Sequence, residues 1–299
     1  MTAARAAAAT VRERLDAAAA RLAAAGVETP RVDAEWLLAG ALGVRRGELW
    51  LDLDRPLDAA ADARFERALA RREGREPLQQ VLGWEEFCGL RVRVTPDVLV
   101  PRPETEALVE RALALLPPPG RRVPVVADVG AGSGCIACAI AHERSDVRVV
   151  AVERSAAALA VARDNVRALG LGGRVSVVAG DLLSSLGTAR LDLVVSNPPY
   201  LPGGLLPSLM PEVSRHEPRL ALDGGPDGLA IVRRLVRDAA RALCPGGALA
   251  VETAGGAQAG EVASLVEAAG FVDVAVQADL AGVRRLVSGR AGAGAREGR

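Results

Sequence analysis

Four short apolar runs in the middle of the chain constrain its fold most strongly. They cover residues 123–129, 147–152, 175–179 and 191–196, are rich in valine, and are separated by stretches with helical patterns. Runs of this length and composition are typical of strands buried on both faces of a parallel sheet. The alternation predicts a Rossmann-like α/β domain, in which ligands bind beyond the carboxyl ends of the strands.

The tetrapeptide Asn197-Pro198-Pro199-Tyr200 follows the last of these runs. Consecutive prolines lack N–H groups and hold the chain extended, which leaves the Asn197 side chain and the Pro198 carbonyl as a rigid pair of acceptors. Tyr200 adds a flat apolar face. Such a site suits a planar group that carries an NH2, with its nitrogen directed at an electrophile. The alternative interpretation is a proline-rich turn that merely closes a strand.

Residues 130–134 form a glycine-rich loop between the first run and a helix. Glycines at alternate positions let the backbone turn tightly and approach a ligand at the positive end of that helix. Glu153 ends the second strand, where a carboxylate can accept hydrogen bonds from both hydroxyls of a ribose. After the third strand, Asp181 can accept from an adenine amino group while Leu182 packs on the ring.

Two cofactor classes fit this nucleoside pocket. NAD-type loops usually read G-x-G-x-x-G, whereas G-x-G-x-G with an acid ending the second strand suits S-adenosylmethionine, and the tetrapeptide after the fourth strand favours the latter. The methionine end is then expected beside the tetrapeptide's Asn197 and against Asp128, Gly130, Ala131, Gly132, Ser133 and Gly134. Glu153 would hold the ribose, and Asp181 with Leu182 the adenine.

The chain divides into a helical part and an α/β part. Residues 1–76 show apolar spacing typical of a small helical bundle, which is either a structural cap or a docking domain for a macromolecular substrate. Residues 77–100 read as a linker with a β-hairpin at 84–87 and 90–94. Residues 101–290 form the second domain, and a Gly/Ala/Arg-rich stretch over 291–299 is expected to fray.

Residues 101–106, Pro-Arg-Pro-Glu-Thr-Glu, open a helix. Proline near the first helical position with acids in the first turn is a common helix start. Arg102 is in addition a candidate to line the cleft and contribute to the cofactor site.

Cys135 and Cys138 form a C-x-x-C, which is compatible with a redox pair or half of a zinc site. No second C-x-x-C exists, and the sequence contains only two histidines. Because the pair lies within an apolar helical run, we predict that both cysteines pack in the core.

The composition excludes several classes of function. Basic and acidic residues balance at 37 each, and every basic residue is arginine, which excludes lysine Schiff-base chemistry. A neutral balance argues against a mainly electrostatic grip on nucleic acid. Arg5, Arg12 and Glu13 interrupt the Ala-rich amino terminus before it reaches signal-peptide or membrane-spanning length. A cytoplasmic protein without membrane contact is expected.

Six motifs between about residues 77 and 285 extend the interpretation: PLQQVLG, VLVPRPETEALVE, DVGAGSGCIA, SNPPY, EPRLALDGGPDGL and LAGVRRLV. With them the chain resembles the protein-(glutamine amide) methyltransferases that modify peptide chain release factors. NPPY occurs in several amino-group methyltransferases, whereas PRPETE with EPRLALDGG is more selective. The resemblance implies a helical amino-terminal domain, a hairpin, and a seven-stranded class I methyltransferase domain with one antiparallel strand. It also implies that residues 197–200 hold the glutamine of a Gly-Gly-Gln loop.

Three positions depart from the family pattern. Leu182 replaces a common aromatic, which would weaken adenine stacking. Val232 stands where a tyrosine is expected before Arg233, and the segment 252–258 is one residue longer than usual. None of the three is expected to touch the amide site.

The sequence therefore predicts transfer of a methyl group from S-adenosylmethionine to a glutamine amide nitrogen of release factors, with S-adenosylhomocysteine as the product. Acceptors on both amide hydrogens and alignment of nitrogen, methyl carbon and sulfur would supply most of the catalysis, without a metal. Acidic residues nearby and solvent both remain candidates for the proton acceptor. The alternatives are another protein glutamine, an exocyclic amine of DNA or RNA, and a catalytically silent nucleotide-binding scaffold. A DNA enzyme would normally have a target-recognition domain and a basic cleft.

Overall fold

The computed structural model describes residues 9–120 and 122–292. The chain forms two compact units. The first, the helical unit, contains the described residues up to Gly83 together with Met210–His216, and the second, the sheet unit, contains Trp84–Leu209 and the chain from Glu217 onward. A short segment from the second half of the sequence therefore belongs to the amino-terminal unit.

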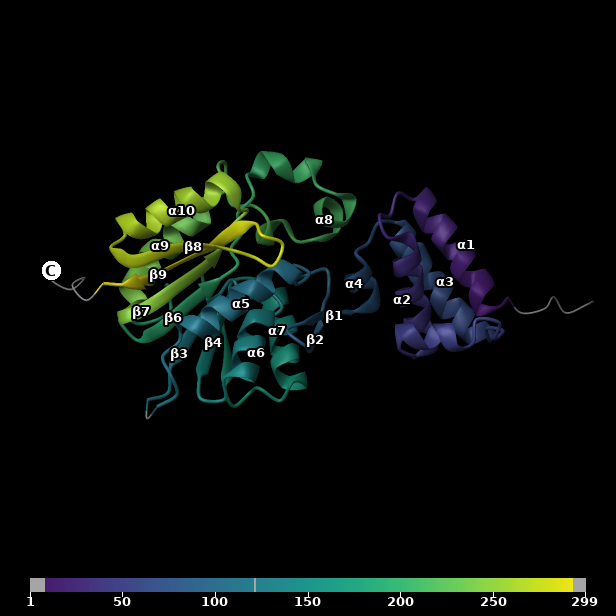
Figure 1. The fold of residues 1–299 in the computed structure, drawn as a ribbon, viewed down its shortest axis with the longest axis horizontal. Helices are drawn as coiled ribbons and strands as arrows, with labels where there is room; N and C mark the ends of the chain where they lie inside the picture. Colours follow the sequence, from purple (N-terminus) through teal and green to yellow (C-terminus); the bar gives the residue numbers. More distant parts are fainter. Residues whose placement is uncertain (1–8, 121, 293–299) are drawn as a thin grey trace, which may run out of the picture. The chain divides into compact units, whose positions relative to one another are not determined.

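The helical unit has one apolar core, to which Leu15, Leu38 and Phe65 contribute fully buried side chains. Thr10 and Glu13 form a reciprocal capping box at its first helix, and the second helix begins at Pro30 and is capped by Gly43. Its elements are α1 (Val11–Ala24), α2 (Pro30–Leu42), the 3₁₀ helix η1 (Arg46–Leu51), α3 (Ala59–Glu73), α4 (Leu78–Leu82) and α8 (Pro211–His216) (Figure 1).

The helical unit is larger than the predicted range of residues 1–76. Leu78, Val81 and Leu82 of α4 pack against its core, so that the unit continues to Gly83. The segment with α8 joins it through Glu212, which forms ion pairs with Arg72 and Arg75. The hairpin, β1 (Trp84–Phe87) with β2 (Leu90–Arg93), belongs to the sheet unit.

The sheet unit is built on seven strands in the order β5-β4-β3-β6-β7-β9-β8, and only β9 runs antiparallel to its neighbours. The chain moves outward from β3 to β5 and then returns to β6, so that the strand order reverses between β3 and β6. Such a switch point is where open α/β sheets bind ligands. The strands are β3 (Val125–Val129), β4 (Arg148–Glu153), β5 (Val175–Ala179), β6 (Leu191–Ser196), β7 (Leu243–Glu252), β8 (Phe271–Ala278) and β9 (Arg284–Ala291).

Helices cover both faces of this sheet (Figure 1). One core lies under α5 (Pro103–Leu115), α6 (Cys135–Glu143) and α7 (Ala156–Ala168). The other lies under α9 (Ala230–Ala242) and α10 (Gly256–Ala268). Cys135 and Cys138 are buried in the first core, which confirms their predicted packing role. The predicted fold class is thereby confirmed, including the single antiparallel strand.

Element boundaries differ from the expected ones mainly at the carboxyl end of the chain. The last strand continues to Ala291, because this residue pairs with Phe271 of β8. Residues 293–299 of the predicted flexible tail lie outside the described residues. Across residues 9–120 and 122–292, no helix is both long and apolar enough to span a membrane.

Candidate active site

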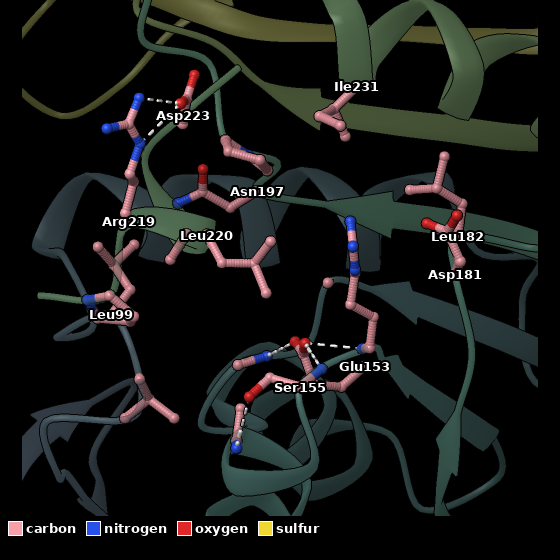
Figure 2. Close-up of a pocket in the computed structure, with 18 of the residues that line it drawn as sticks. Leu99, Glu153, Ser155, Asp181, Leu182, Asn197, Arg219, Leu220, Asp223 and Ile231 are labelled. Carbon is pink, nitrogen blue, oxygen red and sulfur yellow. Dashed lines mark hydrogen bonds and ion pairs between the residues drawn. The ribbon is translucent and has the colours of Figure 1, made fainter. Parts of the chain in front are cut away.

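A cavity of about 560 Å³ lies in the sheet unit at the carboxyl ends of its strands. In Figure 2, Glu153 and Ser155 lie below the opening, Asp181 and Leu182 to its right, and Asn197 above it. The structure thus brings together residues that the sequence separates into four loops. The wall contains Gly130 and Gly132 after β3, Glu153, Arg154 and Ser155 after β4, Gly180, Asp181 and Leu182 after β5, and Asn197 and Pro199 after β6.

The glycine loop after β3 has the backbone that its sequence predicts. Gly130 and Gly132 have φ values of 73° and 54°, in the left-handed region that favours glycine. A Cβ at either position would meet no atom within 4 Å, so that the backbone borders open space. At Gly134 a Cβ would lie 3.3 Å from the Cβ of Ala162, where α6 approaches α7. Two glycines therefore allow close approach of a ligand, and the third allows helix packing.

Asp128 lies beneath this loop rather than on the cavity wall. Its side chain is fully buried, and Oδ2 accepts a hydrogen bond from the Ala137 N–H in the first turn of α6 at 3.0 Å. Oδ1 is buried without a hydrogen-bond partner in the described part of the chain. Burial raises the pKa of Asp128 to about 7. Ala131, Ser133 and Gly134 are buried as well, so that the loop presents its backbone at Gly130 and Gly132 to the cavity.

Glu153 holds the loops around the cavity in place. Its Oε2 accepts from the Gly132 N–H at 2.9 Å, and its Oε1 accepts from the N–H groups of Arg154 and Ser155 at 2.7 and 2.8 Å. A carboxylate has about four acceptor positions, and backbone groups fill three of them in this conformation. The two hydroxyls of a ribose would therefore share the remaining position or displace a backbone N–H.

The proposed adenine side of the cavity contains an ion pair that the sequence did not reveal. Asp181 Oδ2 lies 2.6 Å from Nη2 of Arg234 on α9, and both side chains are more than one-third exposed. An exposed pair contributes little stability, so that Asp181 can exchange it for a ligand at small cost. Leu182 and Ile231 supply apolar surface to the same wall.

Asn197 is oriented by a residue that the sequence interpretation missed. Its Nδ2 donates to Oγ1 of Thr105 at 3.0 Å. None of the hydrogen bonds found among residues 9–120 and 122–292 uses Oδ1, and Asn197 lines the cavity. Thr105 is buried in the first turn of α5. The sequence indicated only a helix start at the PRPETE motif. Thr105, the threonine of this motif, is the residue that makes the contact.

The backbone of the tetrapeptide is enclosed by the motif DGGPDGL. A Cβ at Gly228 would lie 2.4 Å from the Tyr200 carbonyl oxygen, and one at Gly224 would lie 2.8 Å from that of Pro199. A side chain at Gly224 or Gly228 would therefore clash with the backbone of the tetrapeptide. The carbonyl of Tyr200 also accepts from Nε2 of Gln258 at 2.8 Å. The expectation that the segment 252–258 does not touch the amide site is therefore wrong, because folding brings α10 against the end of the tetrapeptide.

Pro198 and Tyr200, the other two residues of the tetrapeptide, lie beside the cavity. Pro198 is buried, and Asn197 and Pro199 supply the wall. Burial raises the pKa of the Tyr200 hydroxyl to about 12, and the nearby Glu252 carboxyl adds to this effect. Tyr200 therefore stays protonated at neutral pH.

Arg102 forms an ion pair instead of lining the cavity. Its Nη2 lies 2.5 Å from Oε2 of Glu217, whose side chain is only 1% exposed. Oε1 of Glu217 accepts from the Val100 N–H at 3.1 Å. The pair connects the motifs PRPETE and EPRLAL, which are far apart in the sequence. A direct contact between Arg102 and a cofactor stays a prediction.

The sheet with its single antiparallel strand, the glycine loop after β3 and the acid that ends β4 fit the class of S-adenosylmethionine-dependent methyltransferases. The PrmC N-terminal domain family matches residues 13–83, and the methyltransferase small domain family matches residues 107–207. The catalytic domain of hMettl16, solved in complex with MAT2A 3'UTR hairpin 1, shares the fold with a TM-score of 0.56 and 17% identity over 76% of this chain and 80% of that one.

Two similar proteins specify the family. A release factor glutamine methyltransferase from Geobacter sulfurreducens is 46% identical over 95% of this chain and 97% of its own length. Another, from Burkholderia pseudomallei, is 48% identical over 87% of this chain and 91% of its own. The chain belongs to the release factor glutamine methyltransferase family and is an S-adenosylmethionine-dependent protein-glutamine methyltransferase.

Proposed function

We propose that this protein transfers a methyl group from S-adenosylmethionine to the side-chain amide nitrogen of the glutamine in the Gly-Gly-Gln loop of peptide chain release factors. One observation carries the proposal. Asn197 Oδ1 is left as an acceptor at the cavity while Nδ2 is held by Thr105. The names of the Geobacter and Burkholderia relatives support release factors as the substrate.

The residues around the cavity fit S-adenosylmethionine. Its volume of about 560 Å³ lies within the range of about 300–1,000 Å³ that is usual for ligand pockets. Gly130 and Gly132 border open space, where the backbone can approach the methionine end. Glu153, beside this loop, would hold the ribose, and Asp181 with Leu182, farther along the wall, the adenine.

The mechanism depends on orientation of the substrate amide. An amide nitrogen is a poor nucleophile, because its lone pair is delocalised into the carbonyl. Asn197 Oδ1 and the Pro198 carbonyl would each accept one amide hydrogen, which favours a lone pair turned into the cavity. S-adenosylmethionine, when bound, supplies an electrophilic methyl group on a sulfonium. Holding the reacting atoms in line converts an encounter in solution into a step within one complex, and this positioning supplies most of the rate.

The test combines labelling with mass spectrometry. The purified protein is incubated with isotopically labelled S-adenosylmethionine and a whole-cell extract, and the labelled residue is located. We expect the label on the glutamine of a Gly-Gly-Gln loop, and far less label after the same incubation time with the Asn197→Ala variant. Label found chiefly in nucleic acid, or on a different protein side chain, would contradict the proposal.

A further inference from the structure

Glu252 is a buried carboxylate next to the tetrapeptide. It is the last residue of β7, and its predecessor Val251 pairs with Ser196, the last residue of β6. Glu252 and Asn197 therefore leave neighbouring strands at the same edge of the sheet. Glu252 is only 1% exposed. No ion pair within 4.0 Å was found for it among the described residues, although a buried charge is normally paired.

The cation that acts on Glu252 is already engaged elsewhere. Arg285 of β9 contacts Asp279 at 2.6 Å through its Nε. The Thr105 hydroxyl lies near Glu252, where it lowers the pKa of the carboxyl group. Its Oε2 is buried with no hydrogen-bond partner in the described part of the chain. The same threonine thus lies between Glu252 and Asn197.

A hydroxyl group has one hydrogen to donate and two lone pairs to accept with. The Thr105 hydroxyl accepts from Nδ2 of Asn197, which leaves its hydrogen to be donated to the nearby Glu252 carboxylate. Without the carboxylate, the Thr105 hydroxyl would favour neither orientation of the Asn197 amide, because it could donate to Oδ1 as readily as accept from Nδ2. The Glu252 carboxylate can only accept, so it takes the hydrogen of the Thr105 hydroxyl. The threonine oxygen is then left to accept from Nδ2, which selects one orientation of the Asn197 amide.

We propose that Glu252 and Thr105 are positioning residues for methyl transfer: Glu252, acting through the Thr105 hydroxyl, fixes the Asn197 amide so that Oδ1 rather than Nδ2 faces the substrate nitrogen. With the amide turned by 180°, Nδ2 would meet the NH2 of the substrate, donor against donor. The inference rests on the proposed function and explains why a buried carboxylate is kept without a salt bridge.

The surroundings of Glu252 make this device sensitive to pH. Burial raises the pKa of Glu252 to about 7, with the hydrogen bond from Thr105 and the charge of Arg285 opposing the increase and the charges of Glu104 and Asp279 adding to it. A protonated Glu252 can itself donate to Thr105, which frees the threonine hydrogen for Oδ1 of Asn197. The fraction of correctly oriented amide should therefore rise as pH increases through about 7.

The experiment compares Thr105→Val, Thr105→Ser and Glu252→Gln with the wild type in single-turnover methyl transfer under saturating cofactor. Thr105→Val should slow transfer by about 10-fold or more, as expected for loss of one buried hydrogen bond, with cofactor affinity changed less than about 2-fold. Thr105→Ser, which restores the hydroxyl, should recover the rate to within about 3-fold. Glu252→Gln should abolish the rise of the rate through neutral pH.

Thr253→Val is the matched control. Thr253 is fully buried beside Glu252, but its hydroxyl donates to the Arg285 carbonyl and accepts from the Gly255 N–H. Its loss should leave the pH dependence of the rate intact. A folded Thr105→Val protein that transfers methyl groups at the wild-type rate, or a Glu252→Gln protein that keeps the wild-type pH profile, would overturn the inference.

A second measurement separates this inference from the proposed function. The side-chain NH2 signals of Asn197, followed by ¹⁵N nuclear magnetic resonance, should shift with pH in the wild type and lose this shift in Glu252→Gln. Absence of the shift in the wild type contradicts the positioning role even if glutamine is methylated. If no glutamine is methylated but the shift is present, only the proposed function fails.

Discussion

Two carboxyl groups beside the candidate active site in the sheet unit, Asp128 and Glu252, differ from Glu212 in the helical unit in how they are paired. In the helical unit, Arg72 contacts both Asp33 and Glu212, and Arg75 contacts Glu212 as well. Burial opposes ionisation of Glu212, yet hydrogen bonds from Arg75 and Arg72 outweigh it and lower the pKa to about 2. In the sheet unit, Asp128 and Glu252 each keep a buried oxygen without a hydrogen-bond partner among the described residues.

The difference in pairing indicates a different role for each group of carboxyl groups. A buried charge that is fully paired keeps its geometry, and here it connects α8 to the helices of its unit. A buried polar atom without a partner destabilises the fold. Asp128 and Glu252 carry such atoms next to the glycine loop and the tetrapeptide, where we expect a functional reason. The comparison predicts that substitutions in the first group reduce stability, whereas substitutions around the cavity reduce activity.

The largest effect is expected for Glu212→Ala, which leaves two arginines without their shared carboxylate. Removing one partner of a buried ion pair typically destabilises by about 3–5 kcal/mol, and we expect a loss at the lower end, measured by urea unfolding and by hydrogen exchange in α3. Asp54→Ala is the control, because the side chains of the pair Arg12–Asp54 are 52% and 84% exposed. Equal stability losses for the two variants would remove the distinction between the units.

Asn197→Ala should have the second largest effect, and on rate rather than stability. Losing one preorganised polar contact to the transition state should lower single-turnover methyl transfer by roughly 10²-fold, with a nearly unchanged melting temperature. Asn197→Asp keeps an acceptor but loses the donor to Thr105 and places a negative charge near the sulfonium, so that an intermediate loss is expected that saturating cofactor does not restore. Parallel losses of melting temperature and activity would instead indicate a structural turn.

Glu153→Ala should weaken cofactor binding more than it slows the transfer step. The carboxylate would lose its contact with the ribose and also release the N–H groups of Gly132 and Ser155. A charge-assisted acceptor contributes about 1.5–3 kcal/mol, so that the dissociation constant measured by calorimetry should rise by roughly 10- to 100-fold. Asp164→Ala, which removes an exposed carboxylate from α7, serves as the control. An unchanged affinity in Glu153→Ala would place the ribose elsewhere.

The smallest effect concerns the dependence of stability on pH. Asp128 and Glu252 have folded pKa values of about 7, above their ordinary values of 3.8 and 4.5. Their contribution to stability is therefore complete at low pH and is lost as pH rises through about 7. Glu212 has the opposite sign, since its contribution is complete above its ordinary pKa of 4.5 and is lost as pH falls toward about 2.

The pH effect can be isolated with the double variant Asp128→Asn and Glu252→Gln. Between pH 5 and pH 8 its melting temperature should fall less than that of the wild type, by a difference of about 2–4 °C for each kcal/mol removed. In Glu212→Gln, the loss of stability relative to the wild type should be constant above about pH 4.5 and should shrink as pH falls toward about 2, which completes the test. Identical slopes for the double variant and the wild type would contradict the raised pKa values.

The sequence predicted the local part of the candidate site. Strands at 175–179 and 191–196 were placed with their observed bounds, because runs of β-branched residues identify buried strands. The glycine loop followed from residues that favour positive φ. The tetrapeptide at the end of β6 followed from the same strand. What the sequence determined is therefore the fold class, the ligand edge of the sheet and the place of Asn197 at that edge.

Only the tertiary structure decided which polar groups meet. Asn197 contacts Thr105 across 92 positions of the sequence, Arg102 contacts Glu217 across 115, and Arg72 contacts Glu212 across 140. No local periodicity encodes such pairs, because a polar side chain takes its partner from whichever loop the packed core brings to the same place. Burial raises the pKa of all three carboxyl groups, and the hydrogen bonds from Arg75 and Arg72 reverse this effect at Glu212 but have no counterpart at Glu252 and Asp128, whose pKa values stay raised to about 7.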